Sequence, residues 1–539
     1  MKKWLLLLLL VAGCSSSDRV RFTDNPVIEV THDTTPIAEP LETNYKRLSH
    51  LVDNLILRQT RLGLDPSSPA PALDVNSMGE VPNSSWYTNR ASLTADDLFI
   101  SDPGPESFKP WTVTGMKIGG RNPGFVFADS RGVRWICKFD KPGEPVVSTA
   151  ADVIANKLFY ALGYNTPDDR VVIFLPADLL IGEKAKTKNS LGVKRKMLRE
   201  DLDEVLSSPH CLCSGGMTRA LVSRFLPGKP IGGYSYQGTR IDDPNDKIPH
   251  QNRRSLRALR VFGAWLNHID QKVDNTLDIF IGKNGTGYVR HYMVDFDGCL
   301  GGFWASRHES RIGYEHDLDL GKMLTGIPAL GLTVQPYELL GEVPHPEIGM
   351  LEAAVFDPAT WKPNYANDYF SKCSPADAFW AGTKLMQITD DMIRAAVSGG
   401  KYSSKDIENI MTDILIQRRD KTVAWALTRV SPVGNIDNPL RIAGRLGLMR
   451  FQGLNILGKT SGLTWHAELF DIDGNLILSS PKQMTNPAVT FDLHDVDEDY
   501  LVLQWTATGS NGKLLPPTTA HYGISDKQWK LLGILRDGQ

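Results

Sequence analysis

The segment from Asn267 to Asn275 constrains the fold of this chain more than any other part of its sequence. It follows a stretch with helical periodicity and places Asp270, Lys272 and Asn275 in the pattern His-x-Asp-x-Lys-x-x-Asn. After one hairpin's length of chain comes a second acidic loop, which begins at Asp295. Helix, polar loop, hairpin and acidic loop in this order predict that the two loops meet at one site.

The residues before this segment predict a sheet with one inserted helix. The predicted strands start near Trp111, Phe125 and Val133 and span 170–175 and 221–226. Apolar residues at helical spacing predict a helix that starts at Ser148 or Thr149. At this helix start, Thr149 and Asp152 fit a capping box.

The residues around and after the polar loop are predicted to be mostly helical. The predicted helices span 251–267, 376–387, 390–398 and 404–427. Two strands, 277–281 and 288–294, flank the turn Lys283-Asn284-Gly285 and predict a hairpin.

From Trp111 to Trp425, this order of elements and motifs resembles the two-lobed protein-kinase-like fold. Its Asp-Phe-Asp sequence, which starts at Asp295, resembles atypical groups such as the CotH-type kinases, and the fold resembles HipA-type and phosphoinositide kinases as well. The resemblance implies ATP and Mg²⁺ between two lobes. It implies Asp270 as the catalytic base, Lys272 on the transferring phosphate, and Asn275 and Asp295 as metal ligands.

The same resemblance implies that Lys138, near the end of the third strand, pairs with the nucleotide phosphates. A surface lysine on a strand is the alternative. The acidic partner of this lysine is usually Glu, and here Asp152 is the best-placed acid, with Glu144 second. Asp152 has the competing role in the predicted capping box.

Glycines between the first two strands are the remaining candidates for nucleotide binding. Gly119, Gly120 and Gly124 would let backbone N–H groups approach phosphates closely. They do not complete the pattern Gly-x-Gly-x-x-Gly, and a plain hairpin turn explains them equally well.

The N-terminus predicts export from the cytoplasm. Lys2 and Lys3 precede a short apolar run, and Val11-Ala12-Gly13-Cys14 resembles a bacterial lipobox. This resemblance implies cleavage before Cys14, a lipid on its thiol, and anchoring in the bacterial cell envelope. Ser15 favours the outer membrane, on its periplasmic side. An ordinary secretory signal with an incidental cysteine is the alternative.

The predicted organisation has five parts: a signal segment (1–14), a flexible tether (15–43), an N-terminal helix with an irregular extension (44–110), a kinase-like domain (111–432) and a β-rich, sandwich-like domain (433–539). The kinase-like domain divides into an N-lobe (111–230) and a C-lobe (231–432). The fold class is therefore α+β with an all-β C-terminal domain. The formal net charge of -3 gives no reason to expect a nucleic acid partner.

Three functions fit these residues. The first is a membrane-anchored phosphotransferase that uses ATP and Mg²⁺ to modify a hydroxyl on protein, sugar or lipid. The second is an inactive kinase-like module that binds a component of the cell envelope, where ATP is scarce. The third is a nucleotidyl transferase that uses the same pocket.

Overall fold

The computed structural model describes residues 20–536 apart from short internal segments. These segments are 24–26, 44–51, 53–56, 59, 61–68, 100–101, 118–121, 142, 189–191, 208–213, 304–305, 308, 320–321, 323–333, 341–342, 344, 435, 437–440, 443–444, 447–451, 454–461, 486, 494 and 526–527. Cys14, Gly119 and Gly120 lie outside the described residues, as does most of the helix predicted near Asn44. Within the described ranges, no helix has both the length and the apolar character needed to cross a membrane.

The chain divides into two compact units. The larger comprises Val27–Pro432 with Asn455–Ser461, and the smaller comprises Met1–Pro26, Val433–Leu454 and Gly462–Gln539. The larger unit mixes helices and sheets and the smaller one is built from strands, which is the predicted fold class.

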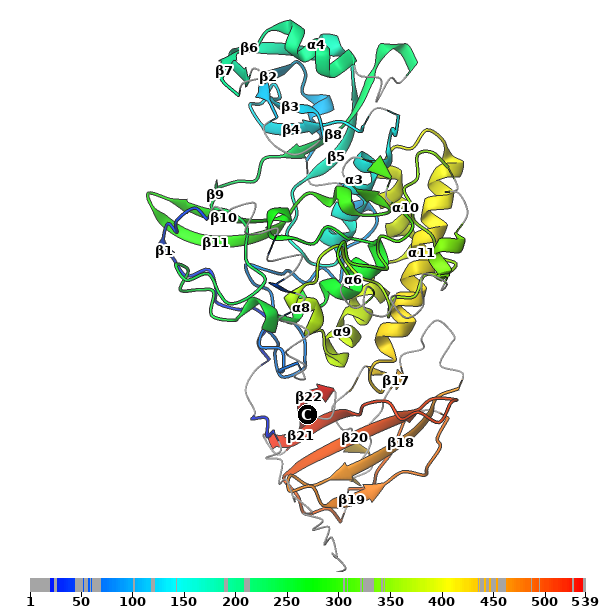
Figure 1. The fold of residues 1–539 in the computed structure, drawn as a ribbon. Coiled ribbons are helices and arrows are strands. Elements are labelled where there is room, and N and C mark those ends of the chain that lie inside the picture. Colours follow the sequence, from blue (N-terminus) through cyan, green and yellow to red (C-terminus); the bar gives the residue numbers. More distant parts are fainter. Residues whose placement is uncertain are drawn as a thin grey trace, which may run out of the picture. The chain divides into compact units, whose positions relative to one another are not determined.

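A seven-stranded sheet in the order β5-β8-β4-β3-β2-β6-β7 forms the first part of the larger unit (Figure 1). Its strands are β2 Trp111–Met116, β3 Gly124–Ala128, β4 Arg134–Lys138, β5 Asp169–Phe174, β6 Leu179–Lys188, β7 Lys194–Lys196 and β8 Thr218–Arg224. Alternate residues of β2, β3 and β4 are buried, and Trp111, Phe127 and Trp135 anchor the core on one face. The opposite face is left for other contacts, because successive side chains of a strand point to opposite sides.

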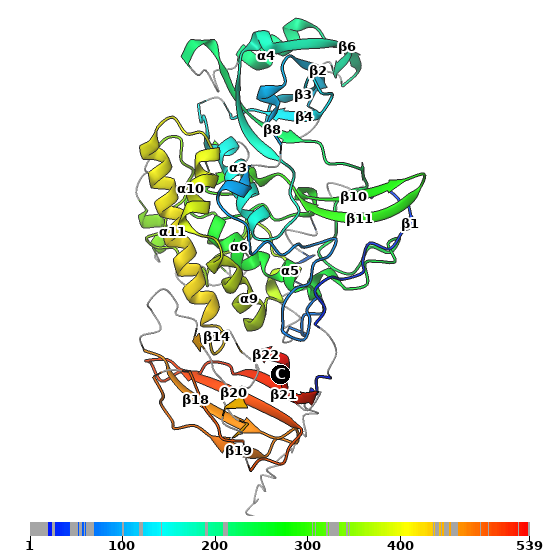
Figure 2. The same cartoon turned by 180° about the vertical axis from the view of Figure 1, so that it is seen from behind.

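Helix α3 (Val147–Ala161) packs on β5 and β8 and, on its other side, on α10 (Asp390–Gly399) (Figures 1 and 2). The predicted capping box is wrong, because no side chain of the helix itself caps its start. Instead Asp140 Oδ1 accepts from the backbone N–H groups of Ser148 and Thr149, at 3.0 and 2.9 Å. Asp140 is fully buried, so the cap also fixes the chain between β4 and α3.

The helical part of the larger unit is accompanied by a second, four-stranded sheet of order β1-β11-β10-β9, which projects to one side of the helices (Figures 1 and 2). Its helices and strands are α5 Arg254–Arg257, α6 Leu259–Leu266, α8 Asp368–Ser371, α9 Pro375–Met386, α11 Lys405–Leu427, β1 Ile37–Ala38, β9 Lys229–Pro230, β10 Thr276–Lys283 and β11 Thr286–Met293. Asn284 and Gly285 both have positive φ, as the predicted tight hairpin turn requires. The single helix predicted over 251–267 is instead a short turn followed by α5 and α6.

Residues 20–43 were predicted to form a flexible tether, but those that the structure describes pack against folded structure. Strand β1 pairs with β11, and Asp33 accepts hydrogen bonds from the backbone N–H and the hydroxyl of Ser85. In the smaller unit, the backbone N–H of Phe22 donates to the Tyr500 hydroxyl at 2.9 Å. Most of these residues are exposed, so strand pairing and hydrogen bonds, together with the buried Asp33, hold the described part of the segment in place.

The smaller unit contains a five-stranded antiparallel sheet of order β19-β18-β20-β21-β22. Its strands are β18 Thr464–Phe470, β19 Leu476–Ser479, β20 Tyr500–Thr508, β21 Thr518–Ser525 and β22 Gln528–Arg536. Burial alternates strictly along β18, and Trp465, Leu503 and Trp505 belong to the core on the buried face. Period-two alternation of this kind is what the sequence of this region predicts.

The sequence reading missed three elements of the first sheet region: β6, β7 and α4 (Arg199–Ser207). Strand β6 runs parallel to β2 and antiparallel to β7, and it extends the sheet beyond the strands that were predicted. The second half of β6 and all of β7 are rich in lysine, which is depleted in strands, so neither propensity nor apolar alternation signals them.

Candidate active site

Lys138, at the end of β4, joins two acidic residues from other elements. Its Nζ donates to Asp295 Oδ1 at 2.6 Å and to Asp152 Oδ2, on α3, at 3.5 Å. Burial opposes the charge on Lys138, but the negative charges of Asp295 and Asp152 outweigh it and raise the lysine pKa well above its ordinary value. The Asp152 side chain is 1% exposed and that of Asp295 is 46% exposed, so Asp295 is the acid that a ligand can reach.

Asp152 is one of two buried carboxyl groups behind the lysine. Burial raises the Asp152 pKa well above its ordinary value; the charge of Lys138 lowers it and the nearby carboxyl of Asp169 raises it further. Asp169, at the start of β5, accepts from Asn156 Nδ2 at 2.7 Å, and burial raises its pKa too. Sequence reasoning missed Asp169, whose only signal is an acidic residue at the start of an apolar strand.

The loop after α6 holds Asp270 through its own residues. Asp270 Oδ2 accepts from Lys272 Nζ at 2.7 Å and from Asn275 Nδ2 at 3.0 Å. Asn275 Nδ2 also donates to the Asp270 backbone carbonyl, at 2.8 Å. Asp270 Oδ1 is buried, and within the described residues it has no hydrogen-bond partner. The spacing of the motif thus fixes one carboxylate oxygen and leaves the other available for a ligand.

Backbone hydrogen bonds bring this loop and the Asp295 loop together. The Ile269 N–H donates to the Gly298 carbonyl at 3.0 Å, and the Val294 N–H donates to the Asn275 carbonyl at 3.1 Å. Gly298 is required at this crossing, because a Cβ there would lie 2.7 Å from the Cβ of Asp270.

The Asp295 loop is anchored by its phenylalanine. Asp295 has the left-handed backbone conformation (φ 64°, ψ 70°), which is uncommon outside glycine. Phe296 is fully buried and stacks on Phe159 of α3, with ring centroids 5.4 Å apart. It also contacts His268, and burial lowers the pKa of that histidine to about 3. His268 is therefore a neutral packing residue, and Phe296 links the acidic loop to the helix that carries Asp152.

Asp297 and Lys117 add further charges near this group. Burial and the charge of Asp295 raise the pKa of Asp297 to about 7, although Lys138 opposes this. Burial and the charge of Lys138 lower the Lys117 pKa, while Asp295 and Asp297 raise it. Lys117 Nζ also donates to the Asn122 carbonyl at 3.1 Å. Sequence reasoning noted Asp297 as an unusual acid but missed Lys117, which directly follows β2.

Among the predicted glycines, the structure describes Gly124. It starts β3, where a Cβ would overlap the backbone carbonyl of Cys137 on the neighbouring strand. Close pairing of β3 and β4 therefore already requires glycine here, whatever its role toward a nucleotide. Of the two acids predicted as partners of Lys138, Asp152 and Glu144, it is Asp152 that accepts a hydrogen bond from the lysine.

The donor groups at this site fit a hard cation such as Mg²⁺. Asp295 offers a half-exposed carboxylate, and Asn275 uses its amide nitrogen for Asp270, which leaves its amide oxygen for a ligand. Mg²⁺ is commonly held by one or two protein oxygens, with phosphate and water completing the octahedron. Among the described residues, here or elsewhere, no group of three or more His, Cys, Asp and Glu side chains is arranged for a metal ion, so phosphate and water would have to supply most of the ligands.

Comparisons with known proteins give a loose likeness to kinases. No protein-family model matches this sequence, and no curated protein does. The Helicobacter pylori proinflammatory kinase CtkA matches with a TM-score of 0.31 and 11% identity, over 57% of this chain and 92% of that one. The Golgi casein kinase with Mn/ADP bound matches with a TM-score of 0.29 and 11% identity, over 62% and 74%. A second structure of the Golgi casein kinase has a TM-score of 0.29 and 10% identity, over 72% and 91%.

At these scores the similarity adds nothing about chemistry, so the site is interpreted from its own residues. The structure brings together Lys138, Asp152 and Asp295, and it places Asp270, Lys272 and Asn275 in the adjoining loop.

Proposed function

We propose that this chain is a phosphotransferase that moves the γ-phosphoryl group of ATP to a hydroxyl acceptor, with Mg²⁺. The observation that carries this proposal is the contact of Lys138 with Asp295, 157 residues apart in sequence, beside a loop in which Asp270 has one oxygen free. Phosphoryl transfer needs positioning and charge neutralisation more than covalent chemistry, and this group of residues supplies both.

Each side chain has a stated role in this proposal. Lys138 pairs with the nucleotide phosphates and is held in place by Asp152. Asp295 and Asn275 hold Mg²⁺, which neutralises phosphate charge when bound. Asp270 Oδ1 orients the acceptor hydroxyl and takes its proton as the acceptor oxygen bonds to the γ-phosphorus and ADP departs. Lys272, whose Nζ donates to Asp270 Oδ2 at 2.7 Å, would place a positive charge beside the transferring phosphoryl group.

The location of the enzyme follows from the N-terminal sequence. We propose that Cys14 carries a lipid and anchors the protein in the bacterial cell envelope, in the outer membrane. Metabolic labelling with a radioactive fatty acid tests this: label should be incorporated into the wild type and not into a Cys14→Ser variant. Equal labelling of the two proteins would contradict the anchor.

Label transfer from ATP tests the activity. Full-length protein is incubated with Mg²⁺ and ATP labelled on either the α- or the γ-phosphate, and label on protein, on added hydroxyl acceptors and in free phosphate is counted. The proposal expects transfer or release of the γ-label only, reduced on the order of 10²-fold or more by Asp270→Asn. Transfer of the α-label would instead show a nucleotidyl transferase. Unchanged ATP with both labels would favour the binding module.

A further inference from the structure

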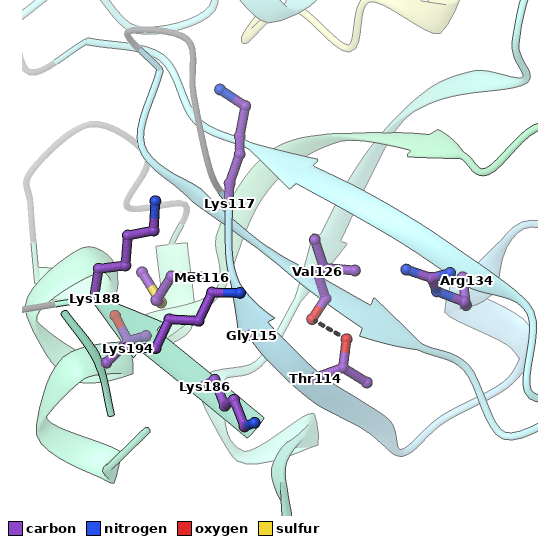
Figure 3. Close-up of a pocket in the computed structure, with 10 residues that line it drawn as sticks. Thr114, Gly115, Met116, Lys117, Val126, Arg134, Lys186, Lys188 and Lys194 are labelled. Carbon is purple, nitrogen blue, oxygen red and sulfur yellow. Dashed lines mark hydrogen bonds between the residues drawn. The ribbon is translucent and has the colours of Figure 1, made fainter. Parts of the chain in front are cut away.

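A cavity of about 530 Å³ with a strongly basic lining lies on the first sheet (Figure 3). Five basic residues line it: Lys117, Arg134, Lys186, Lys188 and Lys194. The other lining residues are Thr114, Gly115, Met116, Val126 and Thr187, so none of the lining side chains is acidic. In Figure 3 the lysines of β6 and β7 lie on one side of Gly115 and Val126, and Arg134 lies on the other. Positive charge is thus concentrated here in a chain whose formal net charge is -3.

The strand register places lysines directly opposite one another. Lys186 pairs with Lys196 and Lys188 with Lys194 across the antiparallel β6–β7 ladder. Directly opposite side chains lie about 5 Å apart, and like charges in such pairs destabilise a sheet. All four lysines are exposed, and none forms an ion pair within the described part of the chain. One nearby acid is engaged by another residue: Asp201 accepts two hydrogen bonds from Arg195.

Protection of a sheet edge does not account for this arrangement. Lysine on an edge strand discourages pairing with other chains, and β7 is such an edge. Lys186 and Lys188, however, lie on β6, which pairs with a strand on each side, and Arg134 lies on β4, in the interior of the sheet. Cations from three strands that converge on one cavity, at a cost to the sheet, indicate an anionic ligand.

We propose that this cavity binds phosphate groups, either several on one soluble ligand or those of neighbouring lipid headgroups. Phosphates match a ring of ammonium and guanidinium groups in charge and in hydrogen bonding. Met116 and Val126 supply an apolar floor for the part of the ligand that carries the phosphates. Val193 directly precedes β7 and Leu198 follows it by two residues; their exposed fractions are 59% and 53%. Exposed apolar residues beside lysines are typical of proteins that touch anionic lipid. The phosphate groups can therefore belong to lipid headgroups as well as to a soluble polyphosphate.

The cavity adjoins the Lys138 site on the same face of the sheet, and Lys117 lines the cavity and also interacts with the charges of Lys138 and Asp295. Side chains at positions 134, 136 and 138 of β4 point the same way, because successive residues alternate. Arg134 and Lys138 are four residues apart, which corresponds to roughly 13 Å along a strand. A bound polyphosphate is therefore expected to leave the nucleotide site open, and binding here does not depend on the proposed function.

Charge-neutralising variants of the full chain test the proposal. The test variant is Lys186→Gln, Lys188→Gln, Lys194→Gln. The matched control is Lys247→Gln, Lys283→Gln, Lys513→Gln, which removes the same charge from three exposed lysines that do not line the cavity. Binding is measured by calorimetry with tripolyphosphate, and by co-sedimentation with vesicles of phosphatidylcholine alone or with a third of phosphatidylglycerol. Asp295→Ala serves as the variant of the proposed nucleotide site.

The proposal predicts that the wild type binds tripolyphosphate, the phosphatidylglycerol vesicles or both, and that the control variant and Asp295→Ala bind the same probe as tightly as the wild type does. The test variant should bind on the order of 100-fold more weakly, because each juxtaposed cation contributes about fivefold. Binding to tripolyphosphate alone would identify a soluble ligand, and binding only to vesicles with phosphatidylglycerol would identify a lipid headgroup. Equal binding by test and control variants, or no binding of either probe to wild type, would overturn the proposal. Loss of binding in Asp295→Ala alone would also overturn it, because it would place the anion at the nucleotide site.

Discussion

Replacement of Asp297 by asparagine is predicted to stabilise the protein at neutral and alkaline pH. Burial and the charge of Asp295 raise the Asp297 pKa from its ordinary 3.8 to about 7. The folded state therefore binds this proton more tightly than the unfolded state does. The stability that the protonated group contributes is complete below about pH 4 and is lost as the pH rises through 7.

The magnitude follows from that pKa difference. A rise from 3.8 to about 7 corresponds to about 4 kcal/mol when the group is fully charged. Asp297 is partly accessible to solvent, so screening reduces this to roughly 2 kcal/mol. Asp297→Asn removes the penalty, and the variant should be more stable than wild type by about that amount at pH 8 and equal to it near pH 4.

Urea denaturation of the full chain between pH 4 and 8, in EDTA, measures this difference. Asp274→Asn is the matched control, because it removes an exposed carboxylate from the neighbouring loop. Its stability should follow that of the wild type at each pH. An Asp297→Asn variant whose advantage does not grow with pH, or a control that behaves identically, would refute the reasoning.

Two further predictions concern the positioning of the site. Gly298→Ala puts a Cβ 2.7 Å from the Cβ of Asp270, so the two loops must separate. We expect a loss of roughly 1–3 kcal/mol in the free energy of unfolding, measured by urea denaturation, and weaker nucleotide binding, measured by calorimetry. A fully active, equally stable variant would contradict the close crossing of the loops. Asp140→Ala leaves the N–H groups of Ser148 and Thr149 without their acceptor. We expect the free energy of unfolding to fall by about 2 kcal/mol and hydrogen exchange at the start of α3 to become faster. Unchanged exchange there would contradict the cap.

The sequence predicted those parts of the molecule that depend on local pattern. Apolar alternation marks the strands at Trp111 and Phe125, and the fixed spacing from Asp270 to Asn275 marks the loop, whose internal hydrogen bonds follow directly from that spacing. Long-range pairing of Lys138 with Asp295 was expected only because the order of elements resembles a known fold. In the structure, Lys138 Nζ donates to Asp295 Oδ1 at 2.6 Å, which is the contact that was expected.

Other features depend on contacts that local patterns do not show. Asp140 caps a helix eight and nine residues away in sequence, so the nearer pair of Thr149 and Asp152 gave a wrong prediction of the cap. Asp169 reaches the site through sheet pairing of β5 and β8. The second half of β6 and all of β7 break the usual strand composition, because Lys and Arg are frequent there.

Binding of ATP to the full chain, measured by calorimetry in excess Mg²⁺ and again in EDTA, tests the central claim most directly. The account predicts Mg²⁺-dependent binding that falls at least about tenfold in Asp295→Asn and in Lys138→Met, and that is unchanged in Asp274→Asn. ATP binding that is absent, or that is equal in Asp295→Asn and wild type, would contradict a nucleotide site built on Lys138 and Asp295.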